Sequence, residues 1–180
     1  FFENGKFQGE GSYYYSNGSY YIGSFLAGRK NGFGAYIINT LDDIETYSGE
    51  FVNDLFEGFG TYYFSNGSVY SGEFKDGLPH GKGTLTYSDG AVYSGGFKFG
   101  KEHGIGIFIC FAHGSKYEGE FQNGKKHGNG VYTYPDGVIY EGDWSEGKRN
   151  GLGTLLYTDG SKLSGEFFED KYVKEIHRNN

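Results

Sequence analysis

The stretch Tyr70-Ser71-Gly72-Glu73-Phe74, followed at a short distance by Gly81-Lys82-Gly83-Thr84-Leu85-Thr86-Tyr87, decides the fold of this chain. In the first part, aromatic residues and glycine alternate with polar residues, a period of two that is typical of a β-strand. The second part alternates in the same way from Gly83 to Tyr87. Because the residues from Asp76 to Gly81 are rich in turn formers, the two parts together predict a β-hairpin.

The same pattern recurs about every 23 residues, so the chain has to be read as a repeat. An Asn-Gly or Asp-Gly pair, such as Asn66-Gly67, follows most of the second strands and is typical of hairpin turns. We therefore predict an all-β fold, an elongated single-layer antiparallel meander of successive β-hairpins. Complete copies open at Tyr21, Tyr47, Tyr70, Tyr93, Tyr117 and Tyr140, and a partial copy opens at Leu163.

The repeats divide the chain into an array over residues 1–168 and a tail. The array is predicted to hold a half repeat over residues 1–20, full repeats that start at residues 21, 47, 70, 93, 117 and 140, and a final half repeat from residue 163. Residues 169–180 abandon the pattern and are predicted to form a C-terminal cap and tail. Since Tyr172, Val173 and Ile176 would share one face of a helix, we expect a short C-terminal helix that covers the last sheet edge.

The composition of the chain suggests how such a sheet is held together. Its 180 residues include 34 Gly, 18 Tyr, 17 Phe and 1 Trp. Glycine costs a helix interior about 1 kcal/mol relative to alanine, so long helices are disfavoured. A glycine inside a strand leaves bare backbone that an aromatic ring on a neighbouring strand can cover. Because a lone sheet encloses no core, we expect these ring–glycine contacts to supply much of its stability.

The formal net charge is −7, and residues 1–90 hold 11 of the 23 acidic side chains but only 5 of the 16 basic ones. This balance argues against nucleic acid as a partner and, less strongly, disfavours membrane phospholipid. A single cysteine, Cys110, forms no disulfide within the chain, which is typical of a reducing compartment. No apolar stretch approaches the roughly 20 residues that cross a bilayer. The sequence therefore predicts a soluble, cytoplasmic protein.

No group of residues in the sequence forms a catalytic, cofactor-binding or metal-binding motif. His80, His103 and His127 occupy the same place in three successive hairpins, but equivalent positions lie two strands apart, roughly 9.6 Å. Zinc–nitrogen bonds of about 2.0–2.1 Å require ligand atoms much closer together. A zinc ion shared across a dimer, through Cys110 and His113, is an alternative that stays open. We therefore expect no enzyme activity, no cofactor and no metal site within one chain.

Residues 117–130 and 140–153 show the repeating pattern in full, as Tyr-x-Gly-acid-aromatic-x-x-Gly-x-x-x-Gly-x-Gly. This pattern resembles the MORN repeat (membrane occupation and recognition nexus), and the resemblance covers residues 2–168. It implies an elongated single-sheet array that serves as a scaffold, a protein-binding groove or a dimerisation module. Bends or special contacts are expected at four departures from the pattern, namely Asp54 in place of Gly, Gly96 in place of the acid, Cys110 in a ring position and the lengthened segment 41–45.

The function that we expect is a non-enzymatic scaffold or adaptor that binds a protein segment along the aromatic–glycine face of the sheet. The segment would be a peptide or a helix, and a homodimer is a further expected arrangement. The resemblance implies a cytoskeletal, ciliary or membrane-adjacent setting. The candidate contact residues form two rows of rings, which packing on glycine alone explains at least equally well: Tyr47, Phe51, Tyr70, Phe74, Tyr93, Phe97, Tyr117, Phe121, Tyr140 and Trp144.

Two alternatives to this function stay open. The first is a module that associates with phosphoinositides or membranes through a weak basic strip, in which each charge supplies only about 1 kcal/mol near an anionic surface. This strip consists of Lys125, Lys126, Lys148 and Arg149. The second alternative is a regulatory array of a larger enzyme, a role that the resemblance implies because the family includes kinases and a methyltransferase.

Overall fold

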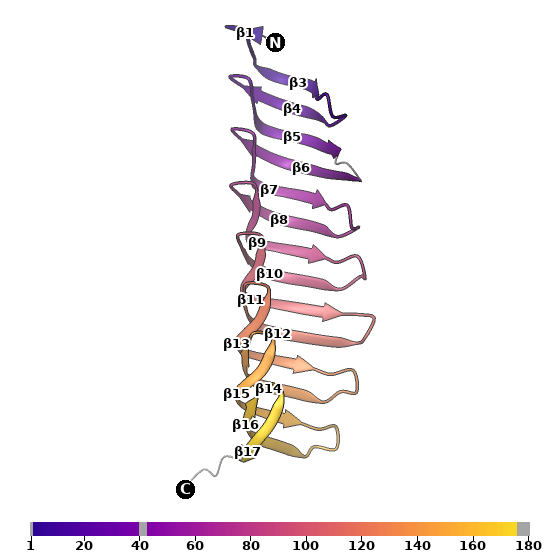
Figure 1. Cartoon of the computed structure of the whole chain (residues 1–180), viewed down its shortest axis with the longest axis vertical. Coiled ribbons are helices and arrows are strands. Elements are labelled where there is room, and N and C mark those ends of the chain that lie inside the picture. The colour runs from indigo at the N-terminus through magenta and orange to yellow at the C-terminus, as the bar shows by residue number, and fades with distance from the viewer. Residues whose placement is uncertain (1, 40–42, 176–180) are drawn as a thin grey trace. The chain divides into compact units, whose positions relative to one another are not determined.

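The computed structural model describes residues 2–39 and 43–175, and this part of the chain contains strands and turns but no helix. This part of the chain therefore has no helix that is long and apolar enough to cross a bilayer. The strands divide between two compact units, Phe1–Ser88 (unit 1) and Asp89–Asn180 (unit 2), which we describe separately (Figure 1). In each unit, strands that follow one another in sequence pair antiparallel. The predicted single-layer meander of hairpins is thus confirmed within each unit.

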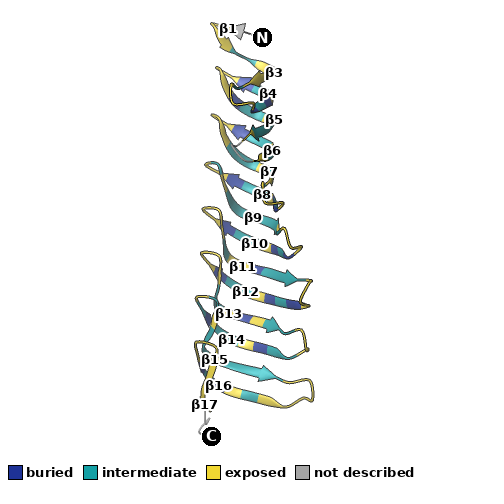
Figure 2. Ribbon diagram, turned by 45° about the vertical axis from the view of Figure 1, so that its right-hand side comes forward, coloured by how far each residue is buried: buried dark blue, intermediate teal, exposed yellow. Residues whose placement is uncertain are grey.

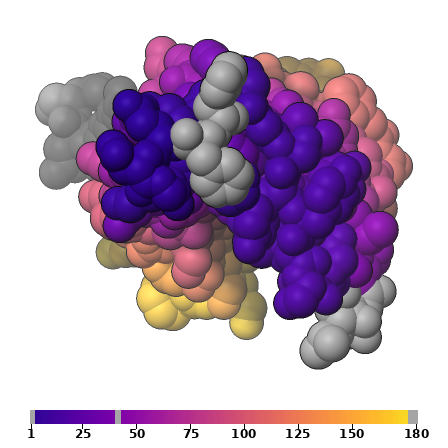
Figure 3. Space-filling model, turned by 90° about the horizontal axis from the view of Figure 1, so that it is seen from above, coloured from indigo at the N-terminus to yellow at the C-terminus, as the bar shows by residue number. Residues whose placement is uncertain are grey.

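Unit 1 consists of a small N-terminal hairpin and a larger sheet. The small hairpin pairs β1 (Phe2–Glu3) with β2 (Lys6–Phe7). In Figure 3 the N-terminal end of this unit, in indigo, faces the viewer, and β3 is the first strand of its sheet. The sheet runs in sequence order through β3 (Gly9–Tyr14), β4 (Tyr20–Leu26), β5 (Arg29–Asn39), β6 (Ile44–Val52), β7 (Leu55–Tyr63), β8 (Val69–Lys75) and β9 (Leu78–Thr86).

Unit 2 repeats the same arrangement without a separate N-terminal hairpin. Within the unit, strands that follow one another in sequence are hydrogen-bonded to each other. The sheet runs in sequence order through β10 (Val92–Lys98), β11 (Lys101–Cys110), β12 (Ser115–Gln122), β13 (Lys125–Thr133), β14 (Ile139–Ser145), β15 (Lys148–Leu156), β16 (Lys162–Phe168) and β17 (Lys171–Glu175).

The turn inside each hairpin is shorter than the sequence suggested. In the β8–β9 hairpin, Lys75 already pairs with Leu78, so that the turn consists of Asp76 and Gly77 alone. Both residues have positive φ, 51° and 82°, as a two-residue type I′ turn requires. The residues from Leu78 to Gly81, which were expected to belong to the turn, therefore start the second strand.

A β-bulge lies beside a pair of facing glycines in the hairpins from β4–β5 to β14–β15. In the β6–β7 hairpin the register shifts beyond Gly49 and Gly60. Gly58 has a φ of +61°, which suits glycine, and the carboxylate of Glu50 fills the space beside it. This carboxylate accepts the N–H of Phe59 at 3.1 Å. The acid of the repeat thus braces the bulge, which bends and twists the strand. The equivalent bonds run from Lys82 to Glu73, from Asn129 to Glu120 and from Leu152 to Asp143.

The buried side chains are mostly aromatic and come mainly from the first strand of each hairpin. Figure 2 shows them as dark-blue bands that recur from one hairpin to the next. Because alternate residues of a strand point to opposite faces, the buried Tyr47 and Phe51 share a face with Gly49 between them. We call this face the tyrosine face of each unit and the other one the opposite face. Its tyrosines are Tyr21, Tyr47 and Tyr70 in unit 1 and Tyr93, Tyr117 and Tyr140 in unit 2.

The prediction of a C-terminal capping helix is wrong for the residues that the structure describes. After a turn at Glu169 and Asp170, Lys171–Glu175 form β17, which pairs antiparallel with β16. Tyr172 lies against Gly165, so the ring–glycine pattern continues for one more strand. Pairing with β16 satisfies backbone groups that a single helical turn would leave largely unbonded. Ile176, which was assigned to the helical face, lies outside the described residues.

Candidate protein-binding face

The tyrosines of the tyrosine face each cover two glycines. The ring of Tyr47 is 1% exposed and lies against Gly49 on its own strand and Gly60 on the paired strand. A methyl group added to Gly60 would come within 2.5 Å of this ring, so no larger residue fits there. The ring–glycine packing that the composition predicted is thus confirmed. The other tyrosines, Tyr21, Tyr70, Tyr93, Tyr117 and Tyr140, cover Gly34, Gly83, Gly106, Gly130 and Gly153 in the same way.

Each of these tyrosine hydroxyls bonds to the bent part of its own strand. The hydroxyl of Tyr47 donates to the carbonyl oxygen of Glu50 at 2.8 Å. The other five tyrosines bond to the residue three positions on, at 2.8 to 3.1 Å. Burial raises the pKa of Tyr21 and of Tyr140 to about 12 and also raises the pKa of the remaining four. The hydroxyls therefore stay protonated near neutral pH and keep these bonds.

A second row of rings joins neighbouring hairpins of unit 1. Phe51 lies edge-to-face against Tyr47 of its own strand and against Tyr21 of the preceding hairpin, with 5.0 Å between ring centroids in both pairs. Phe74 contacts Tyr47 in the same geometry. Aromatic pairs of this kind contribute about 0.5–1.5 kcal/mol beyond the area that they bury. The rings thus form a continuous column that replaces an enclosed core.

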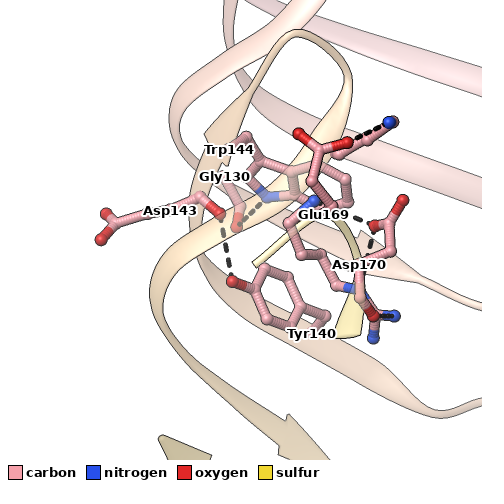
Figure 4. Close-up of polar contacts among 8 residues, drawn as sticks. Gly130, Tyr140, Asp143, Trp144, Glu169 and Asp170 are labelled. Carbon is pink, nitrogen blue, oxygen red and sulfur yellow. Dashed lines mark hydrogen bonds and ion pairs between the residues drawn. The ribbon is translucent and has the colours of Figure 1, made fainter. Parts of the chain in front are cut away.

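Unit 2 builds the same column with a tryptophan. Trp144 lies edge-to-face against Tyr140 at 5.3 Å and against Tyr117 at 5.2 Å between ring centroids. Its indole N–H donates to the carbonyl oxygen of Gly130 at 3.2 Å, a bond that ties β14 to β13 (Figure 4). The indole therefore fills the place of the repeat's phenylalanine and adds a polar bond to the neighbouring strand.

The ten residues predicted to contact a partner form the interior of this face. None of them is more than 7% exposed. A partner lying on the face would instead meet half-buried side chains of the second strands, such as Tyr36, Tyr62 and Tyr132. The prediction from sequence missed these residues, although each stands two positions after a Gly-x-Gly. Phe56 belongs to the same set and stacks on Tyr47, with 3.9 Å between ring centroids.

A lysine takes the place of Phe56 in the first hairpin of the unit 1 sheet. The Nζ atom of Lys30 lies 3.9 Å from the ring centroid of Tyr36 and within 5.8 Å of three further rings. Burial lowers the pKa of Lys30, and the nearby charge of Asp54 acts in the other direction. Asp54 also accepts the N–H of Lys30 at 2.9 Å. This departure from the repeat pattern thus links two successive hairpins.

Lys126 occupies the corresponding position in unit 2. Its Nζ atom lies 4.0 Å from the ring centroid of Tyr132 and 4.7 Å from that of Trp144. Burial lowers the pKa of Lys126 to about 8, while the charge of Asp170 acts to raise it. A cation held against aromatic faces gains about 0.5–2 kcal/mol, which offsets part of the cost of removing it from water. The tyrosine face can therefore hold a cation as well as a ring.

The four residues of the predicted basic strip do not form one surface of free charges. Lys126 and Arg149 lie on the tyrosine face, where the guanidinium of Arg149 is 5.3 Å from the ring centroid of Phe167. Arg149 also forms an ion pair with Asp170 at 3.3 Å. The other two members start β13 and β15, directly after a hairpin turn, and each pairs with the glutamate of the next turn (Figure 4 shows the second pair): Lys125–Glu146 and Lys148–Glu169.

The three histidines that share a repeat position are half-buried within β9, β11 and β13 and do not lie in loops. The Nδ1 atom of His127 is buried and has no hydrogen-bond partner. Within residues 2–39 and 43–175, no three side chains of His, Cys, Asp or Glu come together in a way that could hold a metal ion. Cys110 is half-buried at the end of β11, and His113 lies in the turn that follows.

Comparison with known proteins identifies the repeat. The family model described as MORN repeat matches residues 1–20, 21–40, 47–69, 70–92, 93–114, 117–139 and 140–162. A search of curated proteins finds no match. Among solved structures, the chain is similar to the TCP domain of SAS-4 (dCPAP) of Drosophila melanogaster, solved with a proline-rich motif of Ana2 (dSTIL). That likeness has 16% identity over 92% of this chain and 90% of that chain, with a TM-score of 0.43.

Proposed function

Since the chain belongs to the MORN-repeat family, we propose that it is a non-enzymatic scaffold that binds a segment of a partner protein along the tyrosine face. The observation that carries this proposal is the set of half-buried rings on the second strands, Tyr36, Phe56, Tyr62 and Tyr132, which stand on an already packed column. Large aromatic side chains dominate the binding energy of protein interfaces.

The rigidity of the face also supports this function. The buried tyrosines are fixed by glycines beneath them and by hydroxyl bonds to the main chain, as Tyr47 is fixed by Gly60 and Glu50. Side chains that are already ordered lose little conformational entropy when a partner binds. A peptide or a helix that lays its apolar side chains on this face would therefore meet a surface whose underlying tyrosines need no further ordering.

The setting that we propose is a cytoskeletal, ciliary or membrane-adjacent assembly in the cytoplasm. It rests on the membership of the chain in the MORN-repeat family, since the resemblance to that family implies such a setting. A homodimer that uses the same face is the alternative partner. Light scattering of the chain at several concentrations distinguishes this alternative from binding to another protein, because a dimer gives a mass that rises with concentration.

Site-specific photo-crosslinking tests the proposed face. A photo-reactive phenylalanine analogue replaces Phe56 or Tyr132 in the full chain, and matched variants carry it at Val131 or Thr154, which lie on the opposite face of unit 2. Partners captured from a cell extract are identified by mass spectrometry, and one of them is then purified and crosslinked again. We expect that partner to crosslink through positions 56 and 132 but not through 131 and 154. Crosslinks through 131 and 154 alone would overturn the proposal.

A further inference from the structure

The most exposed apolar side chains of the sheet in unit 1 include a group on its opposite face. Phe33 and Phe59 are 68% and 66% exposed, and Ile22 and Tyr63 are 48% and 51% exposed. Phe59 is paired with Glu73, which stands between Gly72 and the buried Phe74 of the tyrosine face, so its ring points away from the tyrosines. Single exposed apolar residues are common, but a group on one face marks an interaction site.

Phenylalanine and glutamate alternate along one row of this face. Phe33 on β5 is paired with Glu50 on β6, and Phe59 on β7 is paired with Glu73 on β8. Both carboxylates are fixed, because Glu50 accepts the N–H of Phe59 at 3.1 Å and Glu73 accepts that of Lys82 at 2.9 Å. Rings and negative charges therefore each recur at every second strand, a spacing of about 9.6 Å.

The neighbouring row on the same face contains only small side chains over four strands. Ala35, Ser48, Thr61 and Ser71 follow one another in register from β5 to β8. A third row beyond it is larger again and includes the exposed ring of Tyr63. The row of small side chains lies between two rows of larger ones. We call it the low row, and it leaves room for a polypeptide that lies across the strands.

The corresponding row of unit 2 is different. Glu118, Val131 and Glu141 follow one another in register from β12 to β14, where unit 1 has serine, threonine and alanine. Lys116 forms an ion pair with Glu118 at 2.7 Å, which adds a second long side chain at this place. Unit 2 thus has acidic residues on its opposite face but lacks the low row.

The charge of unit 1 indicates what kind of polypeptide would fit. Residues 1–88 contain 10 acidic but only 5 basic side chains, and the carboxylates of Glu50 and Glu73 stand directly beside the exposed phenylalanines. Complementary charge on a partner would come from lysine or arginine. A segment in the polyproline II conformation has three residues per turn and rises about 3.1 Å per residue, so every third side chain lies on the same side at a spacing of about 9.3 Å, close to the repeat of the row.

We propose that the opposite face of unit 1 is a second docking surface, which binds a basic segment of a partner protein whose apolar and Lys or Arg side chains each recur about every third residue. The apolar side chains pack between Phe33 and Phe59, and the cations pair with Glu50 and Glu73. This site is separate from the tyrosine face, so one chain can hold two different partner segments.

Fluorescence anisotropy with the full chain tests the proposal. The probe is a labelled 12-residue peptide in which Lys and Leu each recur every third position and Ser fills the rest. Control peptides replace Lys by Glu or Leu by Ser. We expect only the Lys–Leu peptide to bind, with an affinity that falls as the salt concentration rises. The double variants Phe33→Ser/Phe59→Ser and Glu50→Gln/Glu73→Gln should each weaken binding by roughly tenfold.

Matched variants decide which surface the peptide uses. Ile105→Ser/Leu152→Ser removes exposed apolar side chains from the opposite face of unit 2 and should leave binding unchanged. Equal losses in both units, or no binding of the Lys–Leu peptide, would overturn the proposal. Loss of binding in Phe56→Ser or Tyr132→Ser alone would also overturn it, while supporting the function proposed for the tyrosine face. Because Phe33 and Phe59 are about two-thirds exposed, their variants should keep the melting temperature of the wild type.

Discussion

The β6–β7 hairpin of unit 1 and the β12–β13 hairpin of unit 2 fill the same place in different ways. In the β6–β7 hairpin of unit 1, Phe56 stacks on Tyr47 with 3.9 Å between ring centroids. In the β12–β13 hairpin of unit 2, Lys126 takes that place and holds its ammonium group 4.0 Å from the ring centroid of Tyr132. The first strands hardly differ, since Tyr47 and Tyr117 are both buried over a pair of glycines. Packing therefore determines the residue types of the first strand. The second strand tolerates different residues, and these can distinguish one hairpin from another.

Both units link successive hairpins through a carboxylate that bonds to the main chain, since Asp170 of unit 2 accepts the N–H of Arg149 at 3.0 Å, but unit 2 also has ion pairs between exposed side chains of its hairpins. In unit 1 a carboxylate bonds to the main chain of another hairpin, as when Glu57 accepts the N–H of Asp76 at 3.0 Å. In unit 2, Lys125 and Glu146 form an ion pair at 2.6 Å between exposed side chains. A fixed main-chain donor loses no side-chain entropy on bonding, whereas an ion pair between two long exposed side chains does. We therefore expect the main-chain links to stabilise the fold more than the ion pairs.

Removal of a buried tyrosine should have the largest effect and should be similar in the two units. Tyr47→Ala and Tyr117→Ala each leave a cavity over two glycines and remove a hydroxyl bond to the main chain. We expect each variant to lose about 3–5 kcal/mol of unfolding free energy, as buried aromatic truncations do. Urea denaturation measures the loss, and hydrogen exchange shows which unit opens. Midpoints that barely move in one of the variants would show that the two units do not share the ring–glycine column.

The period of two in residues 70–74 and the regular return of that pattern were enough to predict the meander and its ring–glycine packing. These features depend on local alternation and on residue size, both of which the sequence displays directly. The C-terminal helix was wrong because helical spacing in so short a segment cannot outweigh pairing with the free edge of β16. The residues that a partner could touch could not be predicted in the same way, because Phe51 and Trp144 are buried against rings of neighbouring hairpins, Tyr21 and Tyr117.

The opposite face of unit 1 illustrates the same limit. Phe33 and Phe59 stand in Gly-x-Gly motifs that look alike in every copy, and only the register of β5 to β8 sets them beside Glu50 and Glu73. Register depends on the length of each turn, and the turn of the β8–β9 hairpin was predicted too long. The residue types along the chain could therefore indicate which residues share the opposite face, but not that phenylalanine and glutamate alternate along one row of it.

Titration of Lys126 should have an intermediate effect on the unfolding free energy. It tests the difference between a lysine and a phenylalanine at this place in the hairpin. Burial lowers the pKa of Lys126 from 10.5 to about 8, so between these values the unfolded chain binds more protons at this site than the folded chain. Its contribution to stability therefore rises as the pH rises through that window. Relative to Lys126→Met, the wild type should gain on the order of 1–2 kcal/mol between about pH 7.5 and 9.5, measured by urea unfolding at each pH.

The lysine of unit 1 provides the matched comparison for this titration. Burial also lowers the pKa of Lys30, so the wild type should gain stability with pH relative to Lys30→Met in the same direction. Phe56→Met, which removes no titrating group, should show no such trend. A flat difference for Lys126→Met would mean that the rings of Tyr132 and Trp144 hold the ammonium group charged well above pH 8.

The links between hairpin turns should give the smallest effects and test the second contrast between the units. Asp54→Ala removes the acceptor of the Lys30 N–H in unit 1, and we expect it to cost about 0.5–1.5 kcal/mol of unfolding free energy. Lys148→Ala removes an ion pair with Glu169, but both side chains are nearly half exposed, so water replaces the partner and no measurable change is expected. Thermal melts at low and high salt compare the two variants. A larger loss in Lys148→Ala that disappears at high salt would reverse the order, because it would mean that charge along the turns, and not main-chain bonding, ties the hairpins of unit 2 together.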